Sequence, residues 1–338
     1  MARRSVWSRL VLGLLGLLLL SSASLSVAIW SWLNRPLALA GASAELSIEP
    51  GTTPRDVAQA WVDAGVRTPP RLLYEWFRWS GKAKLIKAGS YEIDTGTTPR
   101  GLLAKMVQGD EQMERVRFIE GWTFRQLRAT LAKAPKLKNT TEGMSDAQVM
   151  SALSLPNLPA EGRFFPDTYV YSRGVSDLTV LRRAHKALQQ RLDQAWAERP
   201  PESPLKSPAE LLTLASIIEK ETGLAADRGL VAGVFINRLR IGMPLQTDPT
   251  VIYGLGDTFD GNLRKRDLLA DTPFNTYTRG GLPPTPIALP GMASLRAAVR
   301  PQATKALYFV ARGDGTSVFS NNLADHNRAV NKFQRGGP

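Results

Sequence analysis

The sequence lacks cysteine entirely and contains only two histidines among its 338 residues. The absence of cysteine excludes disulfide bonds, cysteine nucleophiles and metal sites built from thiolates. No motif that pairs histidines on a helix, cradles a phosphate with glycines or places a nucleophilic serine occurs in a suitable context. We therefore expect neither a metal ion nor a cofactor. We interpret His185 as structural and His326 as a surface or helix-capping residue.

Charge is also absent from the 24 residues between Leu10 and Leu33. About 20 apolar residues are enough for a helix to cross the hydrocarbon core of a membrane. Arginines concentrate on the N-terminal side of this run, which by the positive-inside rule assigns residues 1–9 to the cytoplasm and the bulk of the chain to the other side. The sequence therefore predicts a membrane anchor over residues 10–33.

A cleaved signal peptide is the alternative interpretation of this segment. Small residues around Ala38 and Ala40 resemble a cleavage site, but the apolar run exceeds the ~7–15 residues of a signal-peptide core. Trp30 and Trp32 also stand where aromatic residues anchor a helix at a membrane interface. We therefore expect the segment to be retained as an anchor.

Acidic residues are outnumbered, with 43 Lys and Arg against 30 Asp and Glu and a net charge of +13. An excess of this kind attracts polyanions in general. The sequence contains no RNA- or DNA-binding motif, and the membrane segment argues against such a partner. We interpret the surplus as a solvated basic surface and expect no nucleic-acid partner.

A repeated pentapeptide organises residues 45–115. Gly-Thr-Thr-Pro-Arg occurs at 51–55 and again at 96–100, each time after a short β-like run and before a helical pattern. Threonine followed by proline is standard chemistry for the start of a helix. A looser third copy precedes a helical pattern at 124–134. Three unequal copies are too few for a solenoid, so we predict strand–turn–helix units in a small α+β module.

Four aromatic residues crowd the middle of this module, namely Tyr74, Trp76, Phe77 and Trp79. One face of a helix cannot bury all four. Some of them pack beneath the neighbouring strand, or they form a surface on which sugar rings stack. The sequence leaves both interpretations open.

Residues 209–222 predict a buried helix that ends in two glutamates. Its apolar side chains form a wide stripe, and Gly223 is the expected terminator. Glu219 and Glu221 then fall at a C-terminal helix end, where burial and the helix dipole both raise the pKa of a carboxyl group. A raised pKa suits a general acid that works near neutrality. The alternative is a pair of solvent-facing glutamates.

Helical geometry does not choose between these two glutamates. Glu219 and Glu221 lie about 200° apart at roughly 100° per residue, so both cannot face one cleft. They flank the apolar stripe almost symmetrically. The helical wheel therefore does not decide whether Glu219 or Glu221 is the acid.

Polar and turn-forming residues follow on the polar side of a second amphipathic helix and in two loops. Loops on a rigid scaffold commonly carry binding groups. Amides and hydroxyls near an aromatic ring suit a neutral polyol substrate. The candidate substrate-binding residues are Glu219, Asn237, Arg238, Gln246, Thr247, Asp248, Asn275 and Tyr277.

Several motifs in this region resemble the YceG-like family of endolytic murein transglycosylases. They are EKET, NRL, IGM, LQTDPTVIYGLG, NTY, GLPP and LADHN, and the resemblance runs from about Glu45 to Phe333. It implies an α+β fold with an N-terminal transmembrane helix, a LysM-like peptidoglycan-binding module at 45–115 and a catalytic domain at 116–338. It also implies a single-pass protein of the bacterial inner membrane whose catalytic domain is periplasmic.

The resemblance further implies a reaction. The family cleaves the β-1,4 bond between N-acetylmuramic acid (MurNAc) and N-acetylglucosamine (GlcNAc) inside nascent glycan strands. The cut leaves 1,6-anhydroMurNAc ends and terminates glycan elongation. The family's catalytic glutamate corresponds to Glu221, and Gln246, Asn275 and Tyr277 are similar to its substrate-holding loops. Peptidoglycan glycan strands are then the substrate, and the family context suggests peptidoglycan synthases as partners.

Two other functions remain open at this point. A hydrolytic muramidase would use Asp248 as a second carboxylate, because hydrolytic glycosidases generally need two. A lytic enzyme manages with one, since the substrate supplies the attacking hydroxyl. A membrane-tethered, non-catalytic glycan-binding scaffold would need no acid.

Overall fold

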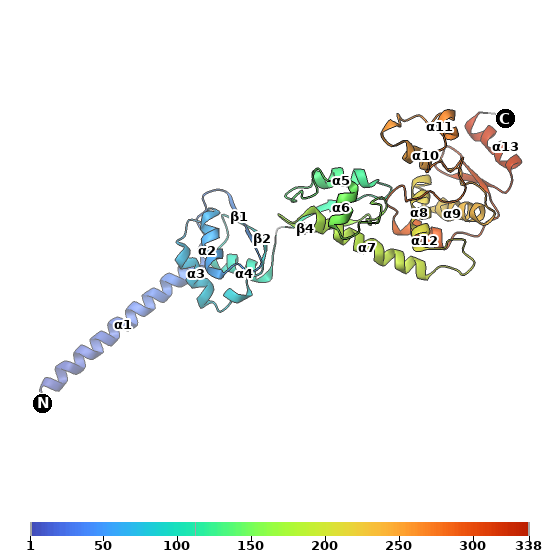
Figure 1. Ribbon diagram of the computed structural model, residues 1–338. Helices are drawn as coiled ribbons and strands as arrows, with labels where there is room; N and C mark the ends of the chain where they lie inside the picture. Colours follow the sequence, from blue (N-terminus) through green and yellow to red (C-terminus); the bar gives the residue numbers. More distant parts are fainter. Residues whose placement is uncertain (1, 112, 337–338) are drawn as a thin grey trace. The chain divides into compact units, whose positions relative to one another are not determined.

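The computed structural model describes residues 2–111 and 113–336, with the side chains of α1 described from residue 12 onward. The chain divides into two units (Figure 1). The first comprises residues 1–114 and 171–174, and the second comprises 115–170 and 175–338. Helices combined with short two-stranded sheets confirm the predicted α+β class. The side chains of the N-terminal arginines, on which the predicted orientation rests, lie outside the described part.

The helix α1 (Ala2–Asn34) is long and apolar enough to cross a membrane between Leu12 and Asn34. Leucines along this stretch are exposed, which a helix in the core of a soluble protein would avoid. The helix is therefore consistent with a single-pass anchor. Trp30 is exposed, but Trp32 packs against the core of the first unit. Trp32 thus contacts protein, and its predicted place at a membrane interface is not supported.

The first unit has the strand–turn–helix organisation that the repeated pentapeptide predicts. Its strands pair antiparallel, with Ser43 opposite Asp94. Thr53 and Thr98 each accept a hydrogen bond from the backbone N–H three residues ahead and so cap their helices. The elements are β1 (Ser43–Ile48), α2 (Pro54–Asp63), α3 (Pro70–Trp79), η1 (Ala83–Leu85), β2 (Gly89–Asp94) and α4 (Pro99–Gln108).

The aromatic cluster on α3 divides between core and surface. Phe77 is fully buried, and the indole of Trp76 donates a hydrogen bond to the carbonyl of Pro99 at 3.0 Å. Trp79 is 79% exposed, and its indole contacts Glu75. The packing interpretation is therefore correct for Trp76 and Phe77, and Trp79 presents an aromatic face to solvent.

The second unit is mainly helical. Its third threonine cap is a full capping box, in which Thr123 and Gln126 bond each other's backbone N–H. The elements are β3 (Met113–Arg117), α5 (Phe124–Ala132), α6 (Asp146–Ala152), β4 (Thr168–Ser172), α7 (Asp177–Ala197), α8 (Pro208–Glu221), α9 (Ala225–Arg240), α10 (Asp248–Leu255), η2 (Gly256–Thr258), α11 (Lys265–Leu269), α12 (Met292–Val299), β5 (Tyr308–Ala311), β6 (Ser317–Ser320) and α13 (Leu323–Gln334). β3 pairs with β4, and one end of each of these two strands belongs to the first unit. β5 pairs with β6.

Helix α8 is the central helix of the second unit. Every residue from Leu211 to Ile218 is buried, because α7, α9, α10 and α12 all pack against it (Figure 1). Its first turn and its last turn emerge from the core. Thr222 ends the helix by adopting an extended backbone, with φ −142° and ψ 127°. Gly223 has no positive φ, so the prediction that this glycine terminates the helix is wrong.

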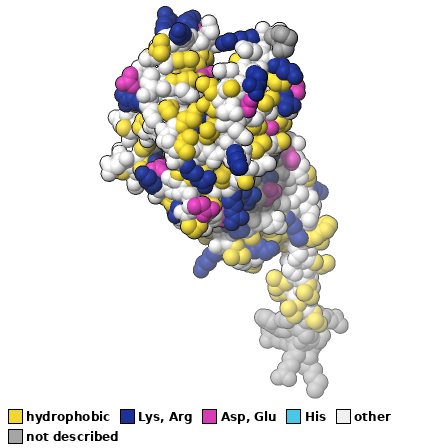
Figure 2. Space-filling model, turned by 90° about the vertical axis from the view of Figure 1, so that its right-hand side faces the viewer, with side chains coloured by type: hydrophobic (Ala, Val, Ile, Leu, Met, Phe, Trp, Pro, Cys, Tyr) yellow, Lys and Arg dark blue, Asp and Glu magenta, His cyan; other side chains and the backbone are white. Residues whose placement is uncertain are grey.

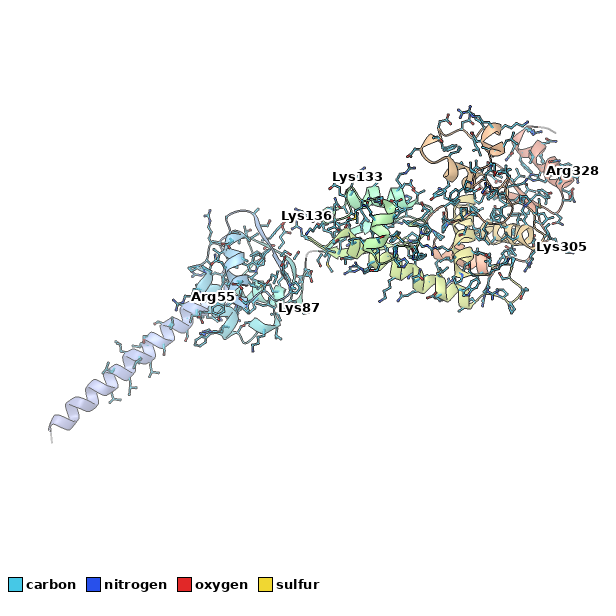
Figure 3. All side chains as sticks on the ribbon, viewed as in Figure 1. Arg55, Lys87, Lys133, Lys136, Lys305 and Arg328 are labelled. Carbon is cyan, nitrogen blue, oxygen red and sulfur yellow. The ribbon has the colours of Figure 1, made fainter. Side chains whose placement is uncertain are left out.

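The basic surplus is spread over both units. On the face drawn in Figure 2, Lys and Arg side chains alternate with acidic and apolar ones. Figure 3 labels six exposed basic residues, of which two lie on the helices α2 and α13 and four in connecting segments: Arg55, Lys87, Lys133, Lys136, Lys305 and Arg328. This distribution favours a solvated basic surface.

Candidate active site

Glu221 is the last residue of α8 and lies where the helix leaves the core. The hydroxyl of Thr247 donates a hydrogen bond to its Oε1. The residue keeps partial solvent access, although protein atoms surround its carboxyl group. Burial raises the pKa of Glu221 to about 7, against the lowering effect of Thr247 and Arg238 and with the help of Asp248. A carboxyl group in this state is partly protonated near neutral pH.

A threonine network fixes the loop that brings Thr247 to the acid. Gln246 has a left-handed backbone, with φ 50°, and its N–H donates to the carbonyl of Thr276 at 3.0 Å. The N–H of Thr247 donates to the hydroxyl of Thr276 at 3.1 Å. Thr250 bonds both Thr247, through its carbonyl, and the Thr276 hydroxyl. Thr247 is only 1% exposed, so its hydroxyl has a fixed direction toward Glu221.

Asp248 and Tyr277 meet on the outer side of this loop. The Tyr277 hydroxyl donates to Asp248 Oδ1 at 2.6 Å. Asp248 is exposed and Tyr277 is half-buried. Burial and then Asp248 raise the pKa of Tyr277, so its hydroxyl stays protonated as a donor. Gln246 is also exposed, so three predicted binding side chains border the acid with solvent access.

Arg238 was expected on a polar helix face, but the structure buries it to 6% exposure. Its Nε donates to the carbonyl of Leu307 and its Nη1 to the carbonyl of Leu245, each at 2.7 Å. Burial lowers the pKa of Arg238, and Tyr308, Tyr277 and Glu221 oppose that shift. Arg238 therefore positions the loop and adds positive potential near the acid.

The two predicted asparagines bond the backbone. Asn237 donates to the carbonyls of Thr304 and Ala306 at 2.8 and 3.1 Å. Asn275 is 0% exposed, donates to three carbonyls of the preceding segment and accepts from the Tyr277 N–H at 2.9 Å. Their side-chain amides thus position the loops, and direct contact with a substrate is not supported.

Glu219 makes its contact on a different side of α8 from the Thr247 loop, as the helical wheel requires. Its Oε2 accepts a hydrogen bond from the N–H of Gly291 at 2.9 Å. Glu120 lies beside it, and burial followed by the charge of Glu219 raises the pKa of Glu120. The two glutamates of EKET therefore belong to different environments, and Glu221 alone shares one with Thr247.

Sequence reasoning missed Glu161, a second carboxyl group whose pKa lies at about 7. Both of its oxygens accept from the Phe124 N–H, and the Tyr253 hydroxyl donates to one of them at 3.3 Å. Burial raises its pKa to about 7. Tyr253 lies on α10, so Glu161 holds the helix that begins at Asp248. The signal in the sequence that could have identified Glu161 is its place, as a charged residue, in the aromatic segment EGRFFP.

His326 was treated as a surface or capping residue, and the structure corrects this interpretation. Its ring stacks on Tyr308, with centroids 5.1 Å apart and planes at 23°. The guanidinium of Arg238 lies 5.2 Å from the Tyr308 centroid. Burial and then Arg238 lower the pKa of His326. Asn322, in the same LADHN region, caps α13 instead.

Metal ligands do not gather in the described part of the chain. Among those residues, no group of three or more His, Cys, Asp or Glu side chains is placed to hold an ion. At Glu221 the structure brings together a carboxyl group with a raised pKa, a fixed hydroxyl and a tyrosine–aspartate pair.

Comparison with known proteins gives consistent matches over most of the chain. A protein of Bacillus subtilis strain 168 called endolytic murein transglycosylase is 34% identical over 264 residues, which cover 73% of each chain. A Streptococcus pneumoniae D39 protein of the same name is 30% identical over 282 residues, 72% of this chain and 50% of that protein. A crystal structure of a YceG-like protein from Listeria monocytogenes matches with a TM-score of 0.53 and 29% identity, over 85% of this chain and 98% of that one.

The family model agrees with these relatives. The model described as the YceG-like family matches residues 46–332, which include both units apart from α1. The matched range contains Glu221, the threonine loop and the Tyr308–His326 pair. On this match, and on the identity and coverage of the Bacillus relative, the chain belongs to the YceG-like family.

Proposed function

We propose that this chain is a membrane-anchored lytic murein transglycosylase in which Glu221 is the only acid–base residue. The names of its relatives support the reaction class of a murein transglycosylase. The observation that carries the residue assignment is the state of Glu221, whose carboxyl group has a pKa of about 7 and a fixed partner in Thr247. A general acid is most effective when its pKa lies near the working pH.

One carboxyl group is enough for the proposed reaction. Protonated Glu221 donates its proton to the glycosidic oxygen as the bond from MurNAc C1 to that oxygen breaks, and GlcNAc leaves with a free hydroxyl. The MurNAc 6-hydroxyl attacks C1 and gives its proton to the Glu221 carboxylate. A 1,6-anhydro ring forms, no water is consumed, and Glu221 ends the cycle protonated.

The surrounding groups suit both halves of this cycle. Thr247 and Arg238 favour the carboxylate that exists after the first proton transfer, and burial and Asp248 favour the acid that exists before it. The opposing effects keep the two protonation states close in free energy, as a residue that acts first as acid and then as base requires. Gln246, Asp248 and Tyr277 have the solvent access needed to bind hydroxyl and acetamido groups of the sugars.

A hydrolytic muramidase is the competing function, and Asp248 is the feature that favours it. Its charge acts on Glu221, so a second carboxylate stands near the acid. However, Asp248 already accepts a short hydrogen bond from Tyr277. A carboxylate held in this way is better suited to binding sugar hydroxyls than to activating water.

The remaining parts of the chain fit delivery of this site to a cell-wall polymer. We propose that α1 anchors the protein in the bacterial inner membrane with residues 1–9 in the cytoplasm and the second unit in the periplasm.

We assign peptidoglycan binding to the first unit, as a LysM-like module, with Trp79 as an exposed ring on which a sugar can stack. A Trp79→Ala change should weaken sedimentation of the protein with purified peptidoglycan by several-fold, whereas Trp76→Ala should mainly lower stability.

Product analysis tests the chemistry. The full chain in detergent is incubated with uncrosslinked glycan strands, and the products are analysed by mass spectrometry. We expect internal cuts with 1,6-anhydroMurNAc ends, a loss of about 10²–10⁴-fold in rate for Glu221→Gln, and most of the rate retained for Glu219→Gln. Free reducing MurNAc ends would instead support the muramidase with Asp248. An inactive wild type would support the non-catalytic scaffold.

A role in ending glycan elongation is the biological extension of this activity. An enzyme that cuts nascent strands while anchored in the membrane would release them near their site of synthesis. We therefore propose peptidoglycan synthases as partners. Crosslinking in intact cells followed by purification should recover a synthase with the wild-type chain, and consistent failure to recover one would remove this part of the proposal.

A further inference from the structure

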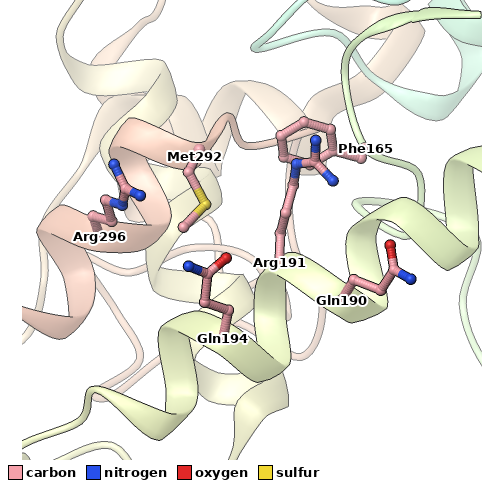
Figure 4. A pocket seen from close by; sticks show the side chains of 6 residues that line it. All are labelled: Phe165, Gln190, Arg191, Gln194, Met292 and Arg296. Carbon is pink, nitrogen blue, oxygen red and sulfur yellow. The ribbon is translucent and has the colours of Figure 1, made fainter.

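A pocket of about 550 Å³ lies between α7 and α12 (Figure 4), and no residue of the loop that carries Thr247 lines it. Its side chains combine two guanidinium groups, two amides and two apolar groups. They are Phe165, Gln190, Arg191, Gln194, Met292 and Arg296. None of them takes part in the chemistry proposed for Glu221.

Arg191 is held in place before any ligand binds. Its guanidinium lies 4.2 Å from the centroid of the Phe165 ring (Figure 4). Its Nη1 donates to the carbonyl of Ala187 at 3.4 Å, and its Nη2 is 3.9 Å from a carboxylate oxygen of Asp167. At that separation the pair with Asp167 is loose. Stacking on the ring restricts the guanidinium and leaves its edge free to bind an anion.

Arg296 supplies the second cation of the pocket. It is exposed on α12, and among the described residues no carboxylate forms an ion pair with it. By contrast, Arg300 on the next turn pairs with Glu198. On the facing helix α7, Gln194 offers an amide between Arg296 and Arg191, and Gln190 offers a second amide on the other side of Arg191 (Figure 4). Two guanidinium groups suit a carboxylate, and the amides suit peptide groups.

The pocket is within reach of a peptide attached to a glycan at Glu221. Met292 follows Gly291, whose N–H bonds Glu219, two residues before Glu221 on α8. The segment that supplies Met292 to the pocket is thus joined by a hydrogen bond to the last turn of α8. A helix with its side chains is about 10–12 Å wide. A peptide of about four or five residues spans up to roughly 3.3–3.6 Å per residue, which covers that width.

We propose that this pocket binds a carboxylate of the peptide stem carried by the murein strand that is being cut. The inference rests on the proposed function, because it takes murein as the substrate. Arg191 and Arg296 bind the carboxylate, Gln190 and Gln194 bind the peptide backbone, and Met292 with Phe165 packs against its alkyl groups. The pocket makes the enzyme prefer strands that still carry their peptides.

The test compares two substrates and three single variants. Uncrosslinked strands are used with their peptides or after an amidase has removed them, and the ratio of kcat/KM on the two is measured for the full chain in detergent. We expect the wild type to favour peptide-bearing strands and Arg296→Gln to reduce that ratio about ten-fold, since a charge-assisted hydrogen bond is lost. Arg296→Lys should keep much of the ratio. Arg300→Gln, which removes the same charge one turn away, should leave it unchanged.

A binding measurement separates failure of this inference from failure of the proposed function. The soluble peptide released by the amidase is titrated into the full chain by calorimetry. We expect binding that weakens about ten-fold in Arg296→Gln and further in Arg191→Gln/Arg296→Gln, whether or not the wild type cuts glycan. A peptide that fails to bind the wild type, or binds the double variant equally well, would overturn the proposal. If the wild type and all variants cut both strand types with the same ratio of kcat/KM, the peptide-binding proposal would also be overturned, but the lytic function would stand.

Discussion

The hydroxyl of Thr247 donates a hydrogen bond to the carboxyl group of Glu221, although 26 positions separate the two residues in the chain. Glu221 ends a helix that is buried from Leu211 to Ile218, and Thr247 is held by two other threonines of the site. Both partners therefore have little freedom. The contact joins the end of α8 to the loop before α10 and opposes the rise in the pKa of Glu221 that burial causes.

Removing this hydrogen bond should move the pH dependence of activity. Thr247→Val has nearly the same shape but no donor, so the charged form of Glu221 loses a favourable contact and its pKa rises. A hydrogen bond to a charged group contributes about 1.5–3 kcal/mol, which corresponds to about one or two pKa units. The alkaline limb of the kcat/KM profile should move up by that amount. The control is Thr130→Val on α5, where the hydroxyl bonds only its own helix, and an unmoved limb in Thr247→Val would contradict the assignment of Glu221.

The raised pKa of Glu221 should cost stability at alkaline pH. Its pKa is about 7 in the folded protein against 4.5 for an ordinary glutamate, so the folded state binds more protons in that interval. The free energy of unfolding therefore falls as pH rises from about 4.5 to 7 and stays lower above it. Glu221→Gln cannot ionise and should be more stable than the wild type by about 1–3 kcal/mol at pH 8. Urea unfolding at pH 8 and at pH 4 measures this, and a difference that persists at pH 4 would refute the explanation.

Arg238 should act mainly through the fold. Arg238→Met keeps the alkyl stem but removes the donors to the carbonyls of Leu245 and Leu307, which then lack these partners in a buried region. Unsatisfied buried groups cost about 1–3 kcal/mol each, so we expect a loss of about 2–4 kcal/mol in urea unfolding. Arg240→Met removes the same charge from an exposed position of α9 and should change stability by less than about 0.5 kcal/mol. Similar losses in both variants would contradict this role.

Close backbone packing should make Gly233 intolerant of a side chain. A Cβ atom there would lie 2.7 Å from the carbonyl oxygen of Gln302 and from Thr304, the segment that Asn237 also bonds. Alanine usually favours a helix over glycine by about 1 kcal/mol. Here we expect overpacking to outweigh that gain, with a net loss of about 1–3 kcal/mol in thermal or urea unfolding.

The matched control for this substitution is Gly223→Ala. A Cβ atom added to Gly223 would have no other atom within 4 Å, and the residue has no positive φ, so the change should leave the free energy of unfolding unchanged. A large loss of stability in Gly223→Ala would support the prediction that Gly223 ends α8 through a backbone conformation that only glycine favours. A gain in stability for Gly233→Ala would show that residues 302–304 shift at little cost to make room for the side chain.

The sequence by itself was sufficient for features that arise within a few neighbouring residues. Thr53, Thr98 and Thr123 cap their helices as predicted, because a cap depends on side chains and backbone groups three residues apart. The buried stripe of α8 was equally readable, since an apolar run of that width has few alternatives. The divergence of Glu219 and Glu221 also followed from helical geometry alone.

Tertiary structure decided what each of those side chains meets. Helical periodicity places Glu219 and Glu221 symmetrically about the apolar stripe of α8. Only their tertiary contacts distinguish them, because Glu221 bonds the Thr247 loop and Glu219 bonds Gly291. Arg238 appeared polar and exposed because its carbonyl partners at Leu245 and Leu307 belong to other parts of the chain. The raised pKa values of Glu161 and Glu221 depend on burial by several elements at once. Local sequence determines where an element begins and which face is apolar, but a titrating group responds to everything packed around it, and that environment exists only after folding.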